Sequence, residues 1–375
     1  MTRALRHALC ACALLASTTA QAVLDVAGID AGADPCADFY AYANRRWLDS
    51  ISIPDDRTRW GAFDEVDERN EKGLVAALDE ARGRAGAGTP QGKAIAFYTS
   101  GMDVAAIEKA GLKPVEELLA QTGRVQDASM LAATLASLHT LGVDAGFGFV
   151  VRPDAKRSDV YLAQVTQAGL GMPERDYYFR DDPRSAEIRD AYRRHVARVF
   201  ELAGAGAPEG ARFADQVMEL ETAFAKASMN AVERRDVDKT YNKMTVAQLE
   251  QSAPGFPWRT YFAALGIRDL REVNVAQPEF ARAFAELADR HALWRTYLRW
   301  QVLRAASPQL PEAFAAQHFD FYDRLLRGRK TRPPRSREVI EVIGGRYGTE
   351  PWRRRWAWCS WKRRSRPSPR RACRT

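Results

Sequence analysis

Histidine is scarce in this sequence of 375 residues: there are five, and no two of them stand three or four positions apart. Zinc sites on helices use paired histidines, most often as His-Glu-x-x-His, so no single helix of this chain supplies one. Cys-x-x-Cys, the Walker phosphate loop and Gly-x-Ser-x-Gly are absent as well. The residues by themselves therefore predict no catalytic group, no metal ligand and no cofactor bound to this chain.

Cysteine is also too sparse for a disulfide framework. Five are present, of which Cys36 alone lies in the body of the chain, while Cys10, Cys12, Cys359 and Cys373 lie near its ends. A fold held by several disulfides would need cysteines spread through the body. We therefore expect the fold to depend on a hydrophobic core, which 46% hydrophobic residues can supply.

The apolar run at the start of the chain is short. It extends from Ala8 to Ala16, far below the roughly twenty residues needed to span a bilayer. Arg3 and Arg6 precede it and Ala20-Gln21-Ala22 follows it, which is the pattern of a secretory signal peptide over residues 1–22. We expect cleavage near Ala22 and an exported, periplasmic or extracellular chain with no stable membrane span.

Positive charge is concentrated at the end of the chain. The net charge of the sequence is +8, but residues 351–375 hold ten Lys or Arg and no acid. Residues 1–350 therefore carry a net charge of −2. The body is therefore near neutral, so the total charge does not indicate a basic groove, and we expect no nucleic-acid partner. The tail at 349–375 also holds four of the nine tryptophans. A frameshift in GC-rich coding DNA is the favoured interpretation of this tail. The alternative is an RNA-binding or membrane-surface segment, because Arg and Trp stack on bases and lie at interfaces.

Amphipathic helical patterns dominate the chain between Asp38 and Ala316. Apolar residues recur every three or four positions, and polar or glycine-containing breaks separate the runs. Runs rich in β-branched and aromatic residues, typical of strands, are few. The sequence predicts a mainly α fold with a minor β element, with helices over 61–81, 128–139, 184–204, 210–228, 276–288, 290–305 and 309–327, and strands over 147–151, 160–165 and 273–275.

Three stretches are not explained by amphipathic packing. The first, Asp34 to Trp47, combines a helix start with a cluster of aromatic residues. The second, Gln167 to Tyr178, is a Gly/Pro loop rich in charges and tyrosines. The third, Thr240 to Thr245, is a polar connector before a helix that begins at Val246. A resemblance to a known family explains them better than packing does.

In order along the chain, these stretches resemble the N-terminal region of the neprilysin-type zinc metalloendopeptidases. Asn44 stands where animal relatives carry a second cysteine, which suits a bacterial-type member. The matching segments are Asp34-Pro35-Cys36-x-Asp38-Phe39-Tyr40-x-Tyr42, Asn44 with Trp47, Ile53-Pro54, Arg59 to Asp64, Phe97-Tyr98-x-Ser100-Gly101-Met102-Asp103, Gln167 to Tyr178, Tyr241 to Met244, Trp300 with Leu303, and Phe319 to Tyr322.

The resemblance implies an order of domains. After the signal peptide, residues 23–53 form a segment that in the family packs on the catalytic domain, 54–330 form a large helical N-terminal peptidase domain that caps it, and 331–348 begin the link to the catalytic domain. The family's zinc-binding helix, glutamate ligand and acid/base residues all lie C-terminal to where this chain stops matching. We therefore expect a fragment truncated before the zinc domain and inactive in peptide hydrolysis when alone, with zinc a cofactor of the family only. The alternative is a non-catalytic helical peptide-binding or scaffold protein.

By the same resemblance, Arg59 corresponds to an arginine that binds the C-terminal carboxylate of the substrate, and Asp64 corresponds to its companion acid. A guanidinium suits this task because it can donate two parallel hydrogen bonds to a carboxylate. Without the resemblance, Arg59 is a surface arginine at the start of a helix, where a cation opposes the helix dipole. The implied partners are peptide substrates and the family's catalytic domain.

Overall fold

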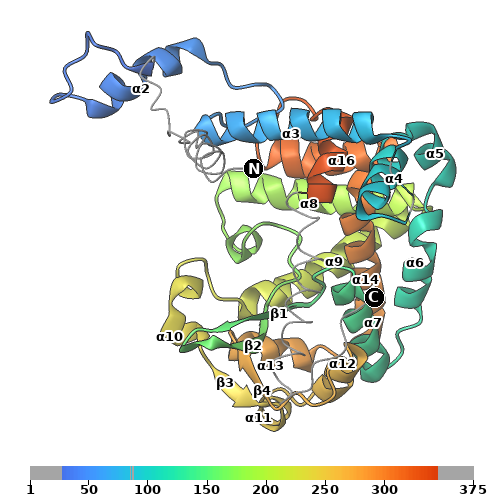
Figure 1. The fold of residues 1–375 in the computed structure, drawn as a ribbon. Coiled ribbons are helices and arrows are strands. Elements are labelled where there is room, and N and C mark those ends of the chain that lie inside the picture. Colours follow the sequence, from blue (N-terminus) through green and yellow to red (C-terminus); the bar gives the residue numbers. More distant parts are fainter. Residues whose placement is uncertain (1–27, 85, 87, 345–375) are drawn as a thin grey trace, which may run out of the picture. The chain divides into compact units, whose positions relative to one another are not determined.

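The computed structural model describes residues 28–84, 86 and 88–344. The expected signal peptide at 1–22 and the tail at 349–375 lie outside these residues. The chain divides between Pro54 and Asp55 into two compact units, each of which is described by itself. Their helices and strands are labelled in Figure 1.

Helix α2 (Phe39–Ser50) is the main element of the first unit. The Asp38 carboxylate accepts a hydrogen bond from the Ala41 amide at 2.9 Å, which satisfies an amide that the first helical turn leaves without a backbone partner. Phe39 and Tyr40 are 69% and 64% exposed. The helix start expected in this aromatic segment is therefore confirmed, and its first two aromatic side chains lie largely in solvent.

Three helices from distant parts of the sequence pack together in the second unit. Helices α3 (Ala62–Ala81) and α4 (Pro90–Met102) both contact α16 (Arg335–Gly344), and Figure 1 shows the orange-red α16 beside the light-blue α3 and the teal α4. The side chains buried between them are Leu78, Tyr98, Val339 and Ile340. Gly101 permits this approach because a Cβ atom there would overlap the Val339 methyl groups.

A second cluster is built on the long helices α8 (Pro183–Leu202) and α9 (Ala207–Ala227), which pack on each other and on α14 (His291–Ala306). Their buried positions follow the three-and-four spacing that the sequence predicts. The shorter α-helices are α5 (Val104–Ala110), α6 (Glu116–Gly123), α7 (Ala128–Thr140), α10 (Val237–Thr240), α11 (Val246–Ser252), α12 (Trp258–Ala264), α13 (Pro278–Glu286) and α15 (Glu312–His318).

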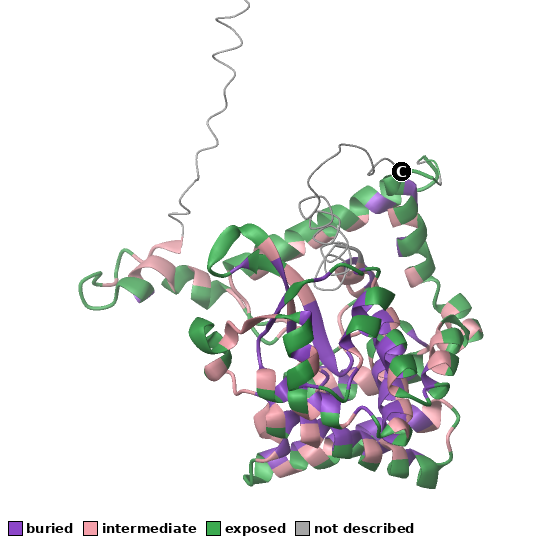
Figure 2. Ribbon diagram, turned by 90° about the horizontal axis from the view of Figure 1, so that it is seen from below, coloured by how far each residue is buried: buried purple, intermediate pink, exposed green. Residues whose placement is uncertain are grey.

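One small sheet lies in the second unit, with strand order β1-β2-β4-β3. Strand β1 (Phe147–Asp154) pairs with β2 (Arg157–Gln167) as an antiparallel hairpin. Strand β4 (Glu272–Val275) joins β2 in parallel and β3 (Lys243–Thr245) in antiparallel orientation. Buried residues gather on this sheet and on the helices packed against it, as Figure 2 shows.

Aromatic side chains fill the core beside the sheet. Phe147 is fully buried, and its ring centroid lies 4.9 to 5.9 Å from five other rings, those of His139, Phe256, Trp258, Tyr261 and Phe284. Such edge and tilted contacts add to the stabilisation from apolar burial. The large core that the composition predicts is therefore present, and the mainly α fold with a minor β element is confirmed.

The structure corrects two details of the sequence prediction. The polar connector at 240–245 ends in strand β3, because residues 243–245 pair with β4. The helix predicted over 309–327 begins only at Glu312, since Leu310 is extended and Pro311 lacks an amide hydrogen. It then continues as a π-helix, η6 (Phe319–Leu325). None of the helices among the described residues is long and apolar enough to cross a bilayer.

Candidate functional site

The predicted substrate-binding pair lies where the chain enters α3. Arg59 precedes the helix, Gly61 is its N-cap and Asp64 is in its first turn. The Arg59 Nε and Asp64 Oδ1 atoms are 3.8 Å apart, an ion pair too long for a hydrogen bond. The fold therefore places the two side chains next to each other, while their role in binding stays a prediction.

The two partners differ in exposure. The Arg59 side chain is 82% exposed, whereas the Asp64 side chain is 16% exposed. Asp64 lies at a helix N-terminus, where the helix dipole stabilises negative charge. The guanidinium of Arg59 is thus accessible to a carboxylate from solvent. Phe63, 88% exposed, provides an apolar ring beside this pair in the sequence.

Ion pairs fix the segment that leads to Arg59. The Arg337 guanidinium on α16 pairs with Asp56 and, at 2.6 Å, with Glu71 on α3. These three side chains are only 13 to 18% exposed. The Asp55 carbonyl accepts a hydrogen bond from the Lys330 amide at 3.0 Å. Residues 55–56 are therefore held between α3 and the segment at 330–337.

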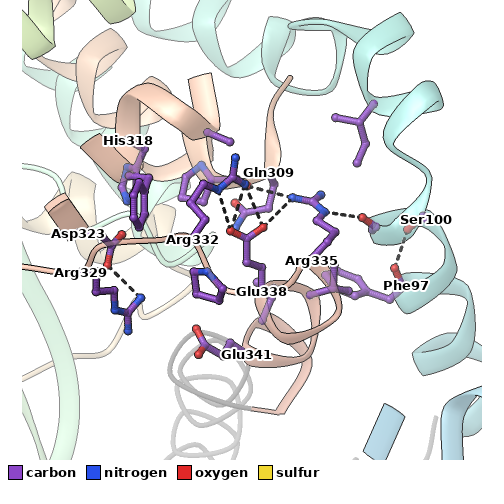
Figure 3. Close-up of a pocket in the computed structure, with 18 of the residues that line it drawn as sticks. Phe97, Ser100, Gln309, His318, Asp323, Arg329, Arg332, Arg335, Glu338 and Glu341 are labelled. Atoms are coloured by element: carbon purple, nitrogen blue, oxygen red, sulfur yellow. Dashed lines mark hydrogen bonds and ion pairs between the residues drawn. The ribbon is translucent and has the colours of Figure 1, made fainter. Parts of the chain in front are cut away.

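A cleft of about 400 Å³ lies elsewhere in the second unit. Its walls come from α4, α5, residues 308–309, α15, η6 and the segment at 327–342, with Phe97, Ile107 and Val339 among its apolar residues. Arg332 and Arg335 converge on the carboxylate of Glu338, as Figure 3 shows. The cleft thus combines apolar walls with a dense set of charges.

The charges of the cleft neutralise one another. Arg332 donates to both carboxylate oxygens of Glu338 at 3.1 Å and to Glu312 at 2.6 Å. Arg335 donates to the Gly101 carbonyl at 2.9 Å and to Glu338 at 3.4 Å. A ligand carboxylate would have to displace these internal partners. The arrangement is that of a structural clamp between α4, α15 and α16.

The polar side chains of the cleft do not form a catalytic arrangement. Burial lowers the pKa of His318 to about 4, so its imidazole is neutral at physiological pH. The Ser100 hydroxyl donates to the Phe97 carbonyl at 2.8 Å and is therefore engaged with its own helix. Nucleophilic catalysis requires a nucleophile within hydrogen-bond reach of a base. Ser100 and His318 do not meet that requirement.

The four histidines among the described residues are dispersed through the second unit. His139 lies 2.6 Å from the Tyr261 hydroxyl, and His195 lies 3.1 Å from the Gln317 amide nitrogen. No three His, Cys, Asp or Glu side chains gather as a possible metal site within residues 28–84, 86 and 88–344. Among the acids of α3, Glu68 pairs with Lys72 at 2.6 Å, one helical turn further on.

The loop at 167–178 is held by buried polar contacts. The Tyr297 hydroxyl donates to the Gly169 carbonyl at 2.7 Å and accepts from the Gly146 amide at 2.9 Å. Gln301 also donates to the Gly169 carbonyl, at 3.2 Å. Gly169 has φ +87°, and a Cβ atom there would overlap the Tyr297 hydroxyl. Glycine is therefore required at this position of the loop.

One buried acid, Glu221, was not singled out by its sequence. It is 0% exposed and accepts hydrogen bonds from the Tyr178 hydroxyl at 2.6 Å and the Tyr192 hydroxyl at 3.0 Å. The signal was present, because Glu221 stands next to Leu220 and three residues before Phe224 on the apolar face of α9. An acid within such a face needs buried partners.

Comparison with known proteins decides the family. A model of the N-terminal region of peptidase family M13 matches residues 35–350. The chain belongs to peptidase family M13. The neprilysin-type resemblance is thereby confirmed, and it extends over most of the chain.

Relatives within the M13 family include eukaryotic and bacterial proteins. The chain is 31% identical over 306 residues to mouse endothelin-converting enzyme-like 1, and 28% identical over 321 residues to mouse endothelin-converting enzyme 1. These matches cover 77% and 82% of this chain but only 39% and 41% of the relatives. The inhibitor complex of Mycobacterium tuberculosis zinc metalloprotease Zmp1 is 36% identical, with a TM-score of 0.78 over 85% of this chain and 50% of that one.

Zinc is named in the Zmp1 structure, but the described residues of this M13 chain do not fit it. A catalytic zinc needs three protein ligands and an open position for water. His139 and His195 are both buried and hydrogen-bonded. Their rings contact different core clusters, that of His139 through Phe147 and that of His195 through Trp300. The described part of the chain thus offers no ligand set for zinc.

Proposed function

We propose that this chain supplies the helical, peptide-holding part of an M13 zinc metalloendopeptidase and does not hydrolyse peptides by itself. The match to the family over residues 35–350 carries the proposal, since it covers most of this chain but about 40% of the curated relatives. Hydrolysis would depend on zinc ligands from the catalytic part of such an enzyme. The domain divisions at 23–53, 54–330 and 331–348 and export after a signal peptide belong to the same proposal.

In this proposal Arg59 binds the C-terminal carboxylate of a peptide, and Asp64 orients the guanidinium. The exposed Arg59 side chain and the partly buried Asp64 beside it support these roles. A hydrogen bond to a charged group contributes about 1.5–3 kcal/mol, so losing it should weaken binding roughly 10- to 100-fold.

Fluorescence anisotropy with labelled peptides tests this function. The chain should bind peptides that have a free C-terminal carboxylate better than the same peptides with an amidated end. Arg59→Ala should remove that preference, whereas Arg82→Ala, a change at another exposed arginine of the second unit, should keep it. Equal binding of both peptide forms by the unmodified chain would contradict the role of Arg59.

A hydrolysis assay tests the catalytic part of the proposal. Peptides incubated with the purified chain and added zinc should remain intact by mass spectrometry. Chelator-sensitive cleavage that copurifies with the chain through successive columns would show that it is an active peptidase. In that case the assignment of catalysis to another part of the enzyme would be wrong.

A further inference from the structure

Glu221 is a fully buried glutamate, 0% exposed, beside the second core cluster. It lies on α9, and side chains from η3 (Arg175–Tyr178) and α8 meet it. The Tyr178 hydroxyl donates to Oε2 at 2.6 Å and the Tyr192 hydroxyl donates to Oε1 at 3.0 Å. The backbone of Gly171 in the 167–178 loop contributes a further hydrogen bond. The carboxyl group thus joins the loop to two helices.

The direction of these hydrogen bonds follows from their outer partners. The Met172 amide donates to the Tyr178 hydroxyl at 3.2 Å, and the Trp300 indole Nε1 donates to the Tyr192 hydroxyl at 3.0 Å. An amide N–H and an indole N–H can only donate. Each tyrosine oxygen therefore accepts a hydrogen bond from Met172 or Trp300 and donates its own hydroxyl proton to Glu221. The network is arranged for an ionised carboxylate that accepts every bond.

Burial favours the neutral form of Glu221, whereas the hydrogen bonds favour the ionised form. Removing a carboxylate from water favours its neutral form, and this effect raises the pKa of Glu221 to about 7. The hydrogen bond from Tyr178, the charge of Arg304 and the hydrogen bond from Tyr192 oppose the rise without cancelling it. Both protonation states are therefore accessible near neutral pH, although the hydrogen-bond pattern suits only one of them.

Other ionisable groups near Glu221 do not change charge in this range. Burial raises the pKa values of Tyr178, Tyr192 and Tyr297, and that of Tyr322 to about 12, so all four stay neutral. Arg304 stays a cation, because the acidic groups around it outweigh its burial. Burial lowers the pKa of His195 to about 3 and that of His318 to about 4, so both imidazoles are neutral above pH 5. Helix α13 also packs on α9, but it does so through the uncharged rings of Phe280 and Phe284, which contact Phe224.

We propose that Glu221 is a proton-controlled latch for the 167–178 loop. As a carboxylate it accepts the bonds that hold the loop on α8 and α9. When it takes up a proton, one carboxyl oxygen becomes a hydroxyl, so a tyrosine hydroxyl must turn to accept the new proton or donate a weaker bond, and the set of bonds that holds the loop is rearranged. No other reactant is needed, because the proton comes from solvent and returns to it.

The position of the 167–178 loop lets a change in these hydrogen bonds affect both core clusters. It connects β2, in the core beside the sheet, with η3 and α8, in the cluster between the long helices. Gly171 approaches Tyr192 so closely that a Cβ atom would overlap the hydroxyl. Any shift of that hydroxyl oxygen therefore alters the fit of the loop. Protonation of one buried acid thus weakens the connection between two core clusters.

The indole N–H of Trp300 reports on the latch, because it donates to the Tyr192 hydroxyl, which in turn donates to Glu221. We would label the full chain with ¹⁵N-tryptophan, assign the Trp300 signal with Trp300→Phe, and record spectra from pH 5.5 to 8.5. The Trp300 shift should titrate with a midpoint within about one unit of pH 7. Glu221→Gln should abolish the titration, whereas Glu219→Gln, at an exposed glutamate of α9 that pairs with Arg290, should leave it unchanged.

Amide exchange provides a second measurement that needs no variant at Glu221. After correction for intrinsic rates, the Gly171 and Met172 amides should exchange several-fold faster at pH 6 than at pH 8, while the Leu220 amide keeps its protection. A Trp300 signal that does not titrate, a titration that persists in Glu221→Gln, or equal protection of the loop at both pH values would each overturn the proposal.

Discussion

Replacing Arg337 with methionine should open α16 selectively. The guanidinium makes two charged hydrogen bonds, to Asp56 and Glu71, each worth about 1.5–3 kcal/mol. The three side chains are 13 to 18% exposed, so solvent screens the interaction only in part. Arg57, 3.4 Å from Glu71, recovers some of the loss. We expect α16 to lose about 2–3 kcal/mol of local stability relative to its opened form.

Hydrogen exchange followed by mass spectrometry measures this change. Helix α16 belongs to the small cluster around Leu78 and Tyr98, so it can open without unfolding the sheet. A loss of 2–3 kcal/mol corresponds to about 30- to 150-fold faster exchange of its amides. Peptides from β1 and β2 should be unchanged.

Arg324→Met is the matched control. Arg324 pairs with Asp320 on the same helix, and its side chain is 56% exposed. Such surface pairs contribute less than about 1 kcal/mol, so exchange of α16 should change by only a few fold. Unchanged protection of α16 in Arg337→Met, or equal effects of the two substitutions, would refute the view that this buried ion-pair cluster holds α16.

Three further predictions follow from the core, the buried acid and the scattered histidines. Phe147→Ala should lower the free energy of unfolding by about 3–5 kcal/mol in a denaturant titration, whereas Phe63→Ala, at an 88% exposed ring, should change it by less than about 0.5 kcal/mol; similar losses would contradict the assigned core. Because burial raises the folded-state pKa of Glu221 from 4.5 to about 7, the unfolding free energy should fall between pH 5 and 8, by roughly 3 kcal/mol relative to Glu221→Gln, and a difference independent of pH would contradict the shift. When the chain is incubated with zinc and then passed through gel filtration, inductively coupled plasma mass spectrometry should find no stoichiometric zinc. One tightly bound zinc per chain would contradict the inference that the described residues hold no ligand set.

Helices with a clear apolar stripe were predictable from the sequence. The pattern over 184–204 became α8, and that over 290–305 became α14, each within two residues of the observed ends. The start of α11 at Val246 was also predictable, because Thr245 and Gln248 form a capping box. These features depend on residues within one turn of each other, so local sequence is sufficient to indicate them.

Features formed by distant residues were not predictable in the same way. Strand β3 has three residues and exists because they pair with β4, nearly thirty positions later. The contacts of Glu221 come from η3, α8 and the 167–178 loop, which only the fold brings to α9. Arg59 and Asp64 were selected by resemblance, since an arginine before a helix is common and its spacing carries no information about a ligand.

The parallel pairing of β2 with β4 affects the order in which the protein can fold during synthesis. The hairpin of β1 and β2 can close as soon as both strands are made, but the Gln167 amide bonds to Gln277, 110 residues later. At about 5–20 residues per second, translation separates these partners by roughly 5–20 seconds. Until β4 arrives, one edge of β2 stays unpaired and the nascent chain is open to misassociation. The core beside the sheet therefore closes late, after β4 at residues 272–275 has been translated.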